Sequence, residues 1–172
     1  ERLLLDRSAA GHGTCGLLRY FNAAGAAPGG DFGEHHDPET HLIPLAIDAA
    51  LGERPPMTIF GTDYPTPDGT CIRDYIHVDD LAAAHEKALD CLITAGDSGY
   101  WNLGTGNGFS VRQIMDAVGH AVGQPVPFKE GPRRVGDPAI LVANSAKAKA
   151  ELGWVPHYTD VNELMATAVA WH

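Results

Sequence analysis

Short apolar strands alternate with amphipathic helices along this chain, and that order indicates an α/β fold. The strongest helical signal begins at Ser110, where Gln113 completes a capping-box pattern ahead of apolar residues spaced along one helix face. Gly123 is expected to end this helix. The same reasoning predicts helices at 1–10, 41–51, 145–152 and 161–171, a helix capped by Asp79 and ending before Gly96, and strands at 17–20 and 57–60.

Two loops hold most of the residues that could bind a ligand. Residues 21–40 are rich in Gly, Pro and His, and such long loops are usually functional. The second loop, 61–72, is broken by prolines and leads to Arg73. A guanidinium can bind two phosphate oxygens at once, so Arg73 indicates a phosphate-bearing small molecule. The alternative is a salt bridge from Arg73 to Asp74 or Asp79 that only shapes the loop.

Composition narrows the class of protein. The 172 residues suffice for one domain or a large part of one, and 44% of them are hydrophobic. Twelve basic residues against 22 acidic ones give a net charge of -10, which argues against nucleic acid as a partner. No apolar run predicts a membrane span. Three widely spaced cysteines favour neither disulfides nor a zinc site, and they fit a reducing cytoplasm.

A glycine-rich segment at 104–108 joins a predicted strand to a predicted helix, where a dinucleotide-binding loop would also lie. It does not match Gly-x-Gly-x-x-Gly, because Phe109 stands where the last glycine is required. A structural strand-to-helix turn is the favoured interpretation.

Three histidines of the first loop raise the question of a metal site. His35, His36 and His41 have no regular helical spacing and no cysteine accompanies them. A solvated loop is the simpler interpretation, and the sequence predicts no metal.

Several stretches form a pattern along nearly the whole chain. They are Leu18 to Gly25 (LRYFNAAG), His41 to Pro44 (HLIP), Asp63 to Thr70 (DYPTPDGT), Arg73 to Val78 (RDYIHV), Tyr100 to Gly106 (YWNLGTG), Arg133 to Asp137 (RRVGD) and Glu151 to Trp154 (ELGW). This pattern resembles the nucleotide-sugar epimerases of the extended short-chain dehydrogenase family. The DYPTPDGT and HLIP stretches point to the branch that inverts C4 of the sugar.

The resemblance implies the C-terminal part of an NAD(P)-binding, Rossmann-like enzyme together with its smaller substrate-binding α/β domain. Residues 1–25 would end the dinucleotide-binding domain and 26–172 would mainly bind the UDP-sugar, while 74–123 could pack back on the first domain. Neither the glycine-rich turn that such an enzyme needs after its first strand nor Tyr-x-x-x-Lys occurs in the chain. We therefore expect the catalytic Tyr and Lys upstream, in a longer enzyme, and no activity from this chain alone.

The resemblance also assigns roles to individual residues. It places Tyr20 and Phe21 beside the nicotinamide of NAD, and it gives Asn22 a hydrogen bond to the substrate; an Asx turn is the alternative for Asn22. The residues assigned to the diphosphate at a helix N-terminus are Thr40, His41 and Leu42. Better-known family members carry asparagines where the first two of these stand.

The remaining assignments concern the rest of the UDP-sugar. They are Thr58, Ile59 and Phe60 for the uracil edge, Arg73 and Arg134 for the diphosphate, Asp137 for a ribose hydroxyl and Leu141 for the sugar pocket. Arg133 is expected to be a surface or structural charge.

The implied reaction takes hydride from C4 of the sugar to NAD and returns it to the other face of a 4-keto intermediate. Members of the family are often homodimers. Two alternatives stay open: another nucleotide-sugar epimerase, dehydratase or decarboxylase of the family, and a noncatalytic nucleotide-sugar-binding module.

Overall fold

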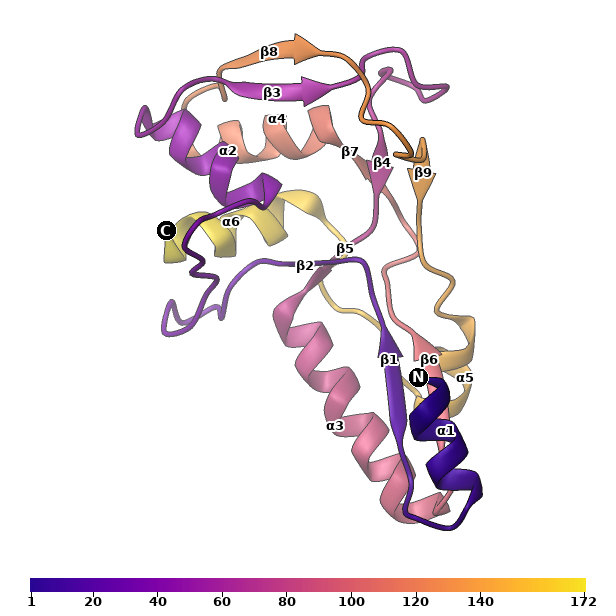
Figure 1. Cartoon of the computed structure of the whole chain (residues 1–172). Helices are drawn as coiled ribbons and strands as arrows, with labels where there is room; N and C mark the ends of the chain where they lie inside the picture. The colour runs from indigo at the N-terminus through magenta and orange to yellow at the C-terminus, as the bar shows by residue number, and fades with distance from the viewer.

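The computed structural model describes residues 1–172, and its elements alternate as an α/β chain should (Figure 1). The helices are α1 (Arg2–Ala9), α2 (Leu42–Leu51), α3 (Val78–Ala95), α4 (Val111–Val122), α5 (Ala146–Leu152) and α6 (Val161–Trp171). The strands are β1 (Gly16–Arg19), β2 (Asn22–Ala24), β3 (Met57–Phe60), β4 (Ile72–Arg73), β5 (Tyr75–His77), β6 (Gly99–Asn102), β7 (Phe109–Ser110), β8 (Phe128–Gly131) and β9 (Ile140–Leu141). The predicted α/β class is confirmed. None of the helices combines the length and the apolar character that crossing a bilayer requires.

The strands form small sheets that are mostly parallel. β1 pairs with β6, β2 with β5 and β3 with β8, all in parallel. β4 lies between β7, which is antiparallel to it, and β9, which is parallel. Parallel pairing requires a crossover between the partners, and here helices lie within each crossover.

Two hydrophobic clusters divide the chain into halves that are visible in Figure 1. In the first half, α2, α4 and α6 pack together beside the β3-β8 pair. In the second, α3 and α5 lie along the β1-β6 pair, with Trp101 and Trp154 buried between them. Residues 74–123 contribute to both halves, because α3 belongs to one and α4 to the other. The assignment of these halves to functional domains stays a prediction.

The capping signals were correct in two helices and wrong in one. Both hydrogen bonds of the capping box between Ser110 and Gln113 are present in α4, and Asp160 caps α6. Asp79 does not cap α3. His77 is the cap, since its Nδ1 accepts the backbone N–H of Asp79 at 3.1 Å and the helix begins at Val78. Asp79 instead lies in the first turn, where its charge complements the helix dipole.

The start of α3 also binds the segment between α5 and α6. The carboxylate of Asp80 is buried and accepts the backbone N–H groups of His157 at 2.8 Å and Tyr158 at 3.0 Å. The indole N–H of Trp154 donates to the backbone carbonyl of Asp80 at 2.9 Å. A buried carboxylate needs such donors, because leaving its charge without them costs several kcal/mol.

His77 is fully buried where the two halves meet. Its ring stacks on Tyr158 at 3.7 Å between centroids, and Nε2 lies 3.1 Å from Oγ1 of Thr167. Thr167 donates its own hydroxyl proton to Leu164, so Nε2–H of His77 is the donor in this contact. Both ring nitrogens are thus used by the neutral imidazole, and burial lowers the pKa of His77.

This environment predicts a loss of stability in mild acid. Because the folded pKa of His77 lies below the unfolded value of about 6.5, its stabilising contribution is complete above about pH 6.5 and is lost as the pH falls below it. The midpoint of urea unfolding should therefore decrease between about pH 7.5 and about pH 5.5. The variant H77Q should show a smaller decrease, whereas H12Q, at an exposed histidine, should behave like the wild type. An equal decrease in H77Q and the wild type would contradict this prediction.

Candidate functional site

The predicted site residues gather around two adjoining cavities. The β2 cavity, about 690 Å³, is lined by residues that include Tyr20, Phe21, Asn22 and His41. The arginine cavity, about 430 Å³, is lined by residues that include Thr40, Thr58, Phe60, Arg73, Arg134 and Asp137. Leu42 and Tyr75 line both. Of the predicted residues, Ile59 and Leu141 line neither.

β3 forms one wall of the arginine cavity, and its successive side chains point to opposite faces of the strand. Thr58 and Phe60 face the cavity, whereas the side chain of Ile59 points into the core and is 1% exposed. β3 has a neighbour on one edge only, so the backbone of Ile59 has an edge without a strand partner. Leu141 lies opposite Arg73 in the register of β9 with β4.

Arg73 is held in place before any ligand arrives. Its Nη1 donates to the backbone carbonyl of Ile72 at 2.7 Å, and its Nη2 forms a short ion pair with Asp137. Its side chain is 14% exposed, so this pair is partly shielded from water. The alternative drawn from the sequence, a salt bridge from Arg73 to Asp74 or Asp79, is therefore wrong, because the partner of Arg73 is Asp137.

The other two arginines of this cavity have no carboxylate partner. Arg134 forms no ion pair and places its guanidinium 4.2 Å from the ring centroid of Phe60. Arg54 was missed by the sequence analysis; it lines the cavity, and its Nε is buried without a hydrogen-bond partner. Its only signal in the sequence is its place between α2 and β3, next to two prolines. The arginine cavity is therefore lined by three guanidiniums, those of Arg54, Arg73 and Arg134, and by one carboxylate, that of Asp137. This excess of positive charge suits an anion.

Arg133 differs from its neighbour. Its Nε donates to Asp63 at 2.6 Å, and its guanidinium lies 4.2 Å from the ring centroid of Tyr64. It does not line the arginine cavity.

Asp74, next to Arg73, is a structural carboxylate. It accepts the hydroxyl of Thr105 at 2.8 Å and the backbone N–H groups of Thr105 at 3.1 Å, Gly106 at 3.3 Å and Ala143 at 3.1 Å. A Cβ at Gly104 would lie 2.4 Å from this carboxylate, so a side chain cannot fit there. The glycine-rich segment 104–108 is therefore the structural turn that its spacing favoured.

Asn22, which lines the β2 cavity, is held by the backbone of Asp74. Its Nδ2 donates to the backbone carbonyl of Asp74 at 2.8 Å, which replaces the Asx turn that was the alternative. Tyr20 and Phe21 precede it and stay 43% and 47% exposed. Their rings border the β2 cavity.

At the start of α2, an internal carboxylate already binds the amides assigned to a diphosphate. Oε1 of Glu39 accepts the backbone N–H groups of Thr40 at 2.6 Å and His41 at 2.7 Å. Burial opposes ionisation of Glu39, but these hydrogen bonds outweigh it and lower its pKa. A phosphate at these amides would have to replace Glu39. Leu42 follows as the first residue of the helix.

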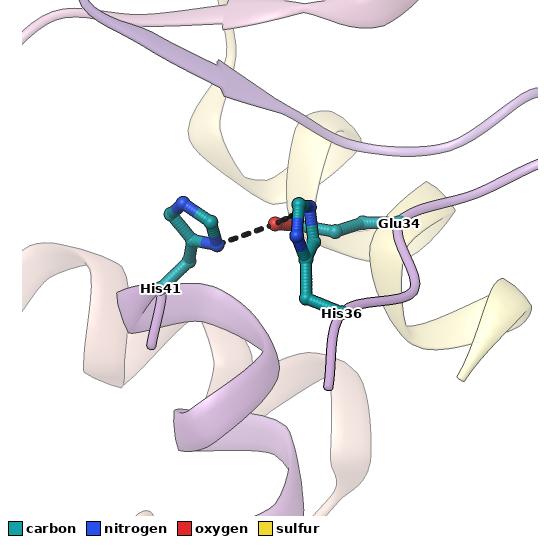
Figure 2. A group of neighbouring side chains, drawn as sticks. All are labelled: Glu34, His36 and His41. Atoms are coloured by element: carbon teal, nitrogen blue, oxygen red, sulfur yellow. Dashed lines mark ion pairs between the residues drawn. The ribbon is translucent and has the colours of Figure 1, made fainter. Parts of the chain in front are cut away.

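The loop between β2 and α2 also brings two histidines together. His36 and His41 lie on either side of Glu34, with ring centroids 4.9 Å apart (Figure 2). His35 is not part of this group.

The sequence of this chain matches one family profile and a set of named relatives. The sequence profile of the family described as GDP-mannose 4,6 dehydratase matches residues 8–167. A protein named UDP-glucose 4-epimerase from Rhizobium leguminosarum bv. trifolii is 51% identical over the whole chain, which covers 52% of that relative.

The similar solved structures are also of UDP-glucose 4-epimerases. The UDP-glucose 4-epimerase from Brucella ovis in complex with NAD has a TM-score of 0.94 and 48% identity over 98% of this chain and 52% of its own. The enzyme from Bifidobacterium longum in complex with NAD+ and UDP has a TM-score of 0.88 and 39% identity over 99% of this chain and 51% of its own.

This chain spans about half the length of the relatives it matches. The family profile and the solved structures each cover almost all of this chain. The chain therefore belongs to the extended short-chain dehydrogenase family, as its sequence pattern predicted.

Proposed function

We propose that the protein containing this chain is a UDP-glucose 4-epimerase, which interconverts UDP-glucose and UDP-galactose, and that this chain supplies the UDP-sugar-binding part. The observation that carries the proposal is the arginine cavity, where Arg54, Arg73 and Arg134 converge beside Phe60. The names and similarity of the relatives support the same activity.

The arginine cavity offers partners for each part of UDP. Arg73 and Arg134 are placed to bind the diphosphate, and Arg54 adds a third guanidinium to the same cavity. Asp137, fixed by Arg73, can accept a ribose hydroxyl. Phe60, 37% exposed beside the guanidinium of Arg134, offers a face for the base.

NAD is the proposed cofactor, with hydride transfer at C4 of the sugar as the chemistry it supplies. The exposed rings of Tyr20 and Phe21, which line a largely apolar cavity, fit a flat nicotinamide. We assign residues 1–25 to the end of the dinucleotide-binding domain and 26–172 mainly to the UDP-sugar-binding domain.

A firm hold on UDP has a mechanistic purpose in this reaction. The 4-keto sugar must turn over so that hydride returns to its opposite face, while it must not escape. Binding energy spent on the nucleotide retains the sugar without fixing its orientation. In this proposal the chain retains the substrate, and Tyr-x-x-x-Lys moves the hydroxyl proton.

Two further assignments concern the compartment and the oligomeric state. The three cysteines are free, which fits a reducing cytoplasm. A homodimer is proposed from the family resemblance, and analytical ultracentrifugation of the natural polypeptide tests it.

We predict that the natural polypeptide converts UDP-galactose to UDP-glucose, and that residues 1–172 expressed alone do not, because they lack Tyr-x-x-x-Lys. A coupled assay of UDP-glucose formation measures both. UDP binding without turnover by the natural polypeptide would support a noncatalytic binding module instead, and turnover by residues 1–172 would refute the division of roles.

We predict that R134A weakens UDP binding about ten- to 150-fold, which corresponds to the roughly 1.5 to 3 kcal/mol of a charge-assisted hydrogen bond. R54A should weaken it as well, because it removes a positive charge that lines the same cavity. R133A is the matched control and should bind UDP like the wild type, since Arg133 pairs with Asp63 outside the cavity. Calorimetric titration with UDP measures all three. Equal losses in R133A and R134A would refute the assignment.

The description of the family profile favours a second candidate, a dehydratase or epimerase that acts on another nucleotide sugar. The choice of base separates the two. We predict that UDP binds at least about tenfold more tightly than GDP, a difference of about 1.4 kcal/mol. A preference for GDP or dTDP in the same titration would favour the second candidate.

A further inference from the structure

Glu34, His36 and His41 bring three metal-ligating atoms to one place (Figure 2). Nδ1 of His41 lies 2.7 Å from Oε1 of Glu34, and Nε2 of His36 lies 3.4 Å from the same oxygen. All three candidate ligand atoms are within 4.8 Å of one another. Ion pairs with Glu34 would explain both contacts only with both imidazoles protonated, whereas a metal ion binds the two rings in their neutral form. Nδ1 of His41 also lies 2.9 Å from Oε1 of Glu39, and a bound ion would replace this contact.

Two of the three side chains, those of Glu34 and His41, come from backbone positions that the fold fixes. The indole N–H of Trp171 in α6 donates to the backbone carbonyl of Glu34 at 2.9 Å. Gly33 packs so closely on the same indole that a Cβ there would lie 2.1 Å from the ring. His41 is the N-cap residue of α2, and its backbone N–H is bound by Glu39. Ligands held in this way lose little freedom when they bind an ion.

The donor set selects the kind of ion. Two imidazole nitrogens and one carboxylate oxygen suit Zn²⁺ and its neighbours in the first transition row, whereas Ca²⁺ and Mg²⁺ prefer all-oxygen sites. Three protein ligands leave a fourth tetrahedral position for water. All three residues line the β2 cavity, so an ion could enter from solvent.

We propose that Glu34, His36 and His41 bind one divalent transition-metal ion of the zinc type, which ties the loop after β2 to the start of α2. This proposal departs from the sequence prediction of no metal, because a loop needs no regular spacing to bring its ligands together. This proposal concerns the loop alone and stands whether or not the protein binds UDP.

The test is calorimetric titration of the chelator-treated natural polypeptide with Zn²⁺. The wild type should bind one ion at this site, and H36A and H41A should each weaken binding by at least about 100-fold, since loss of even an outer-shell partner costs about 10- to 100-fold. H35A is the matched control, because His35 is adjacent in sequence but outside the group. It should bind Zn²⁺ like the wild type. Circular dichroism of each variant checks that it is folded.

A second group, formed by Asp48, Glu53 and His172, offers one imidazole and two carboxylates and could compete for the ion. H172A distinguishes the two and should leave the high-affinity binding unchanged. Absence of binding to the wild type, an equal loss in H35A, or a loss in H172A with full binding by H36A would each overturn the proposal.

Discussion

The buried carboxylate of Asp74 is the interaction on which the site depends. It gathers backbone N–H groups from the turn after β6 and from the segment after β9, while the backbone carbonyl of the same residue holds Asn22. Chain segments separated by many residues therefore meet at one point, directly after Arg73. Removing the carboxylate would leave the buried backbone N–H of Thr105 without its partner, at a cost of about 1–3 kcal/mol. The position of Arg73 in the cavity follows from this arrangement.

Asp80 plays the corresponding role for the second half of the molecule. Its carboxylate and carbonyl hold the segment from Trp154 to Tyr158 against α3. His77 lies one turn earlier and contacts Thr167 of α6, which belongs to the first half. Residues at the start of α3 thus contact both halves of the molecule. Because these contacts are buried and polar, they fix one relative placement of the halves more specifically than apolar packing alone.

The helices could be predicted from sequence because their signals are local. Ser110, Gln113 and the apolar face of α4 lie within four turns, so cap and periodicity support the same boundaries. Strands of two or three residues, such as β4 and β9, show no period and are defined only by their partners. The same limit applies to the site: Arg73 was identified by its chemistry, but its partner Asp137 lies 64 residues away and local spacing could not reveal the pair.

The charge of the chain and the charge of its cavity have opposite signs, and both matter for an anionic ligand. The net charge of -10 repels a nucleotide from a distance, but salt screens this repulsion beyond about 8–10 Å. Inside the cavity, partly shielded guanidiniums act at contact distance, where their attraction is strongest. The ion pair of Arg73 with Asp137 stabilises one orientation of the guanidinium before binding. Less side-chain entropy is then lost on binding, so the acidic surface favours solubility without weakening local recognition of an anion.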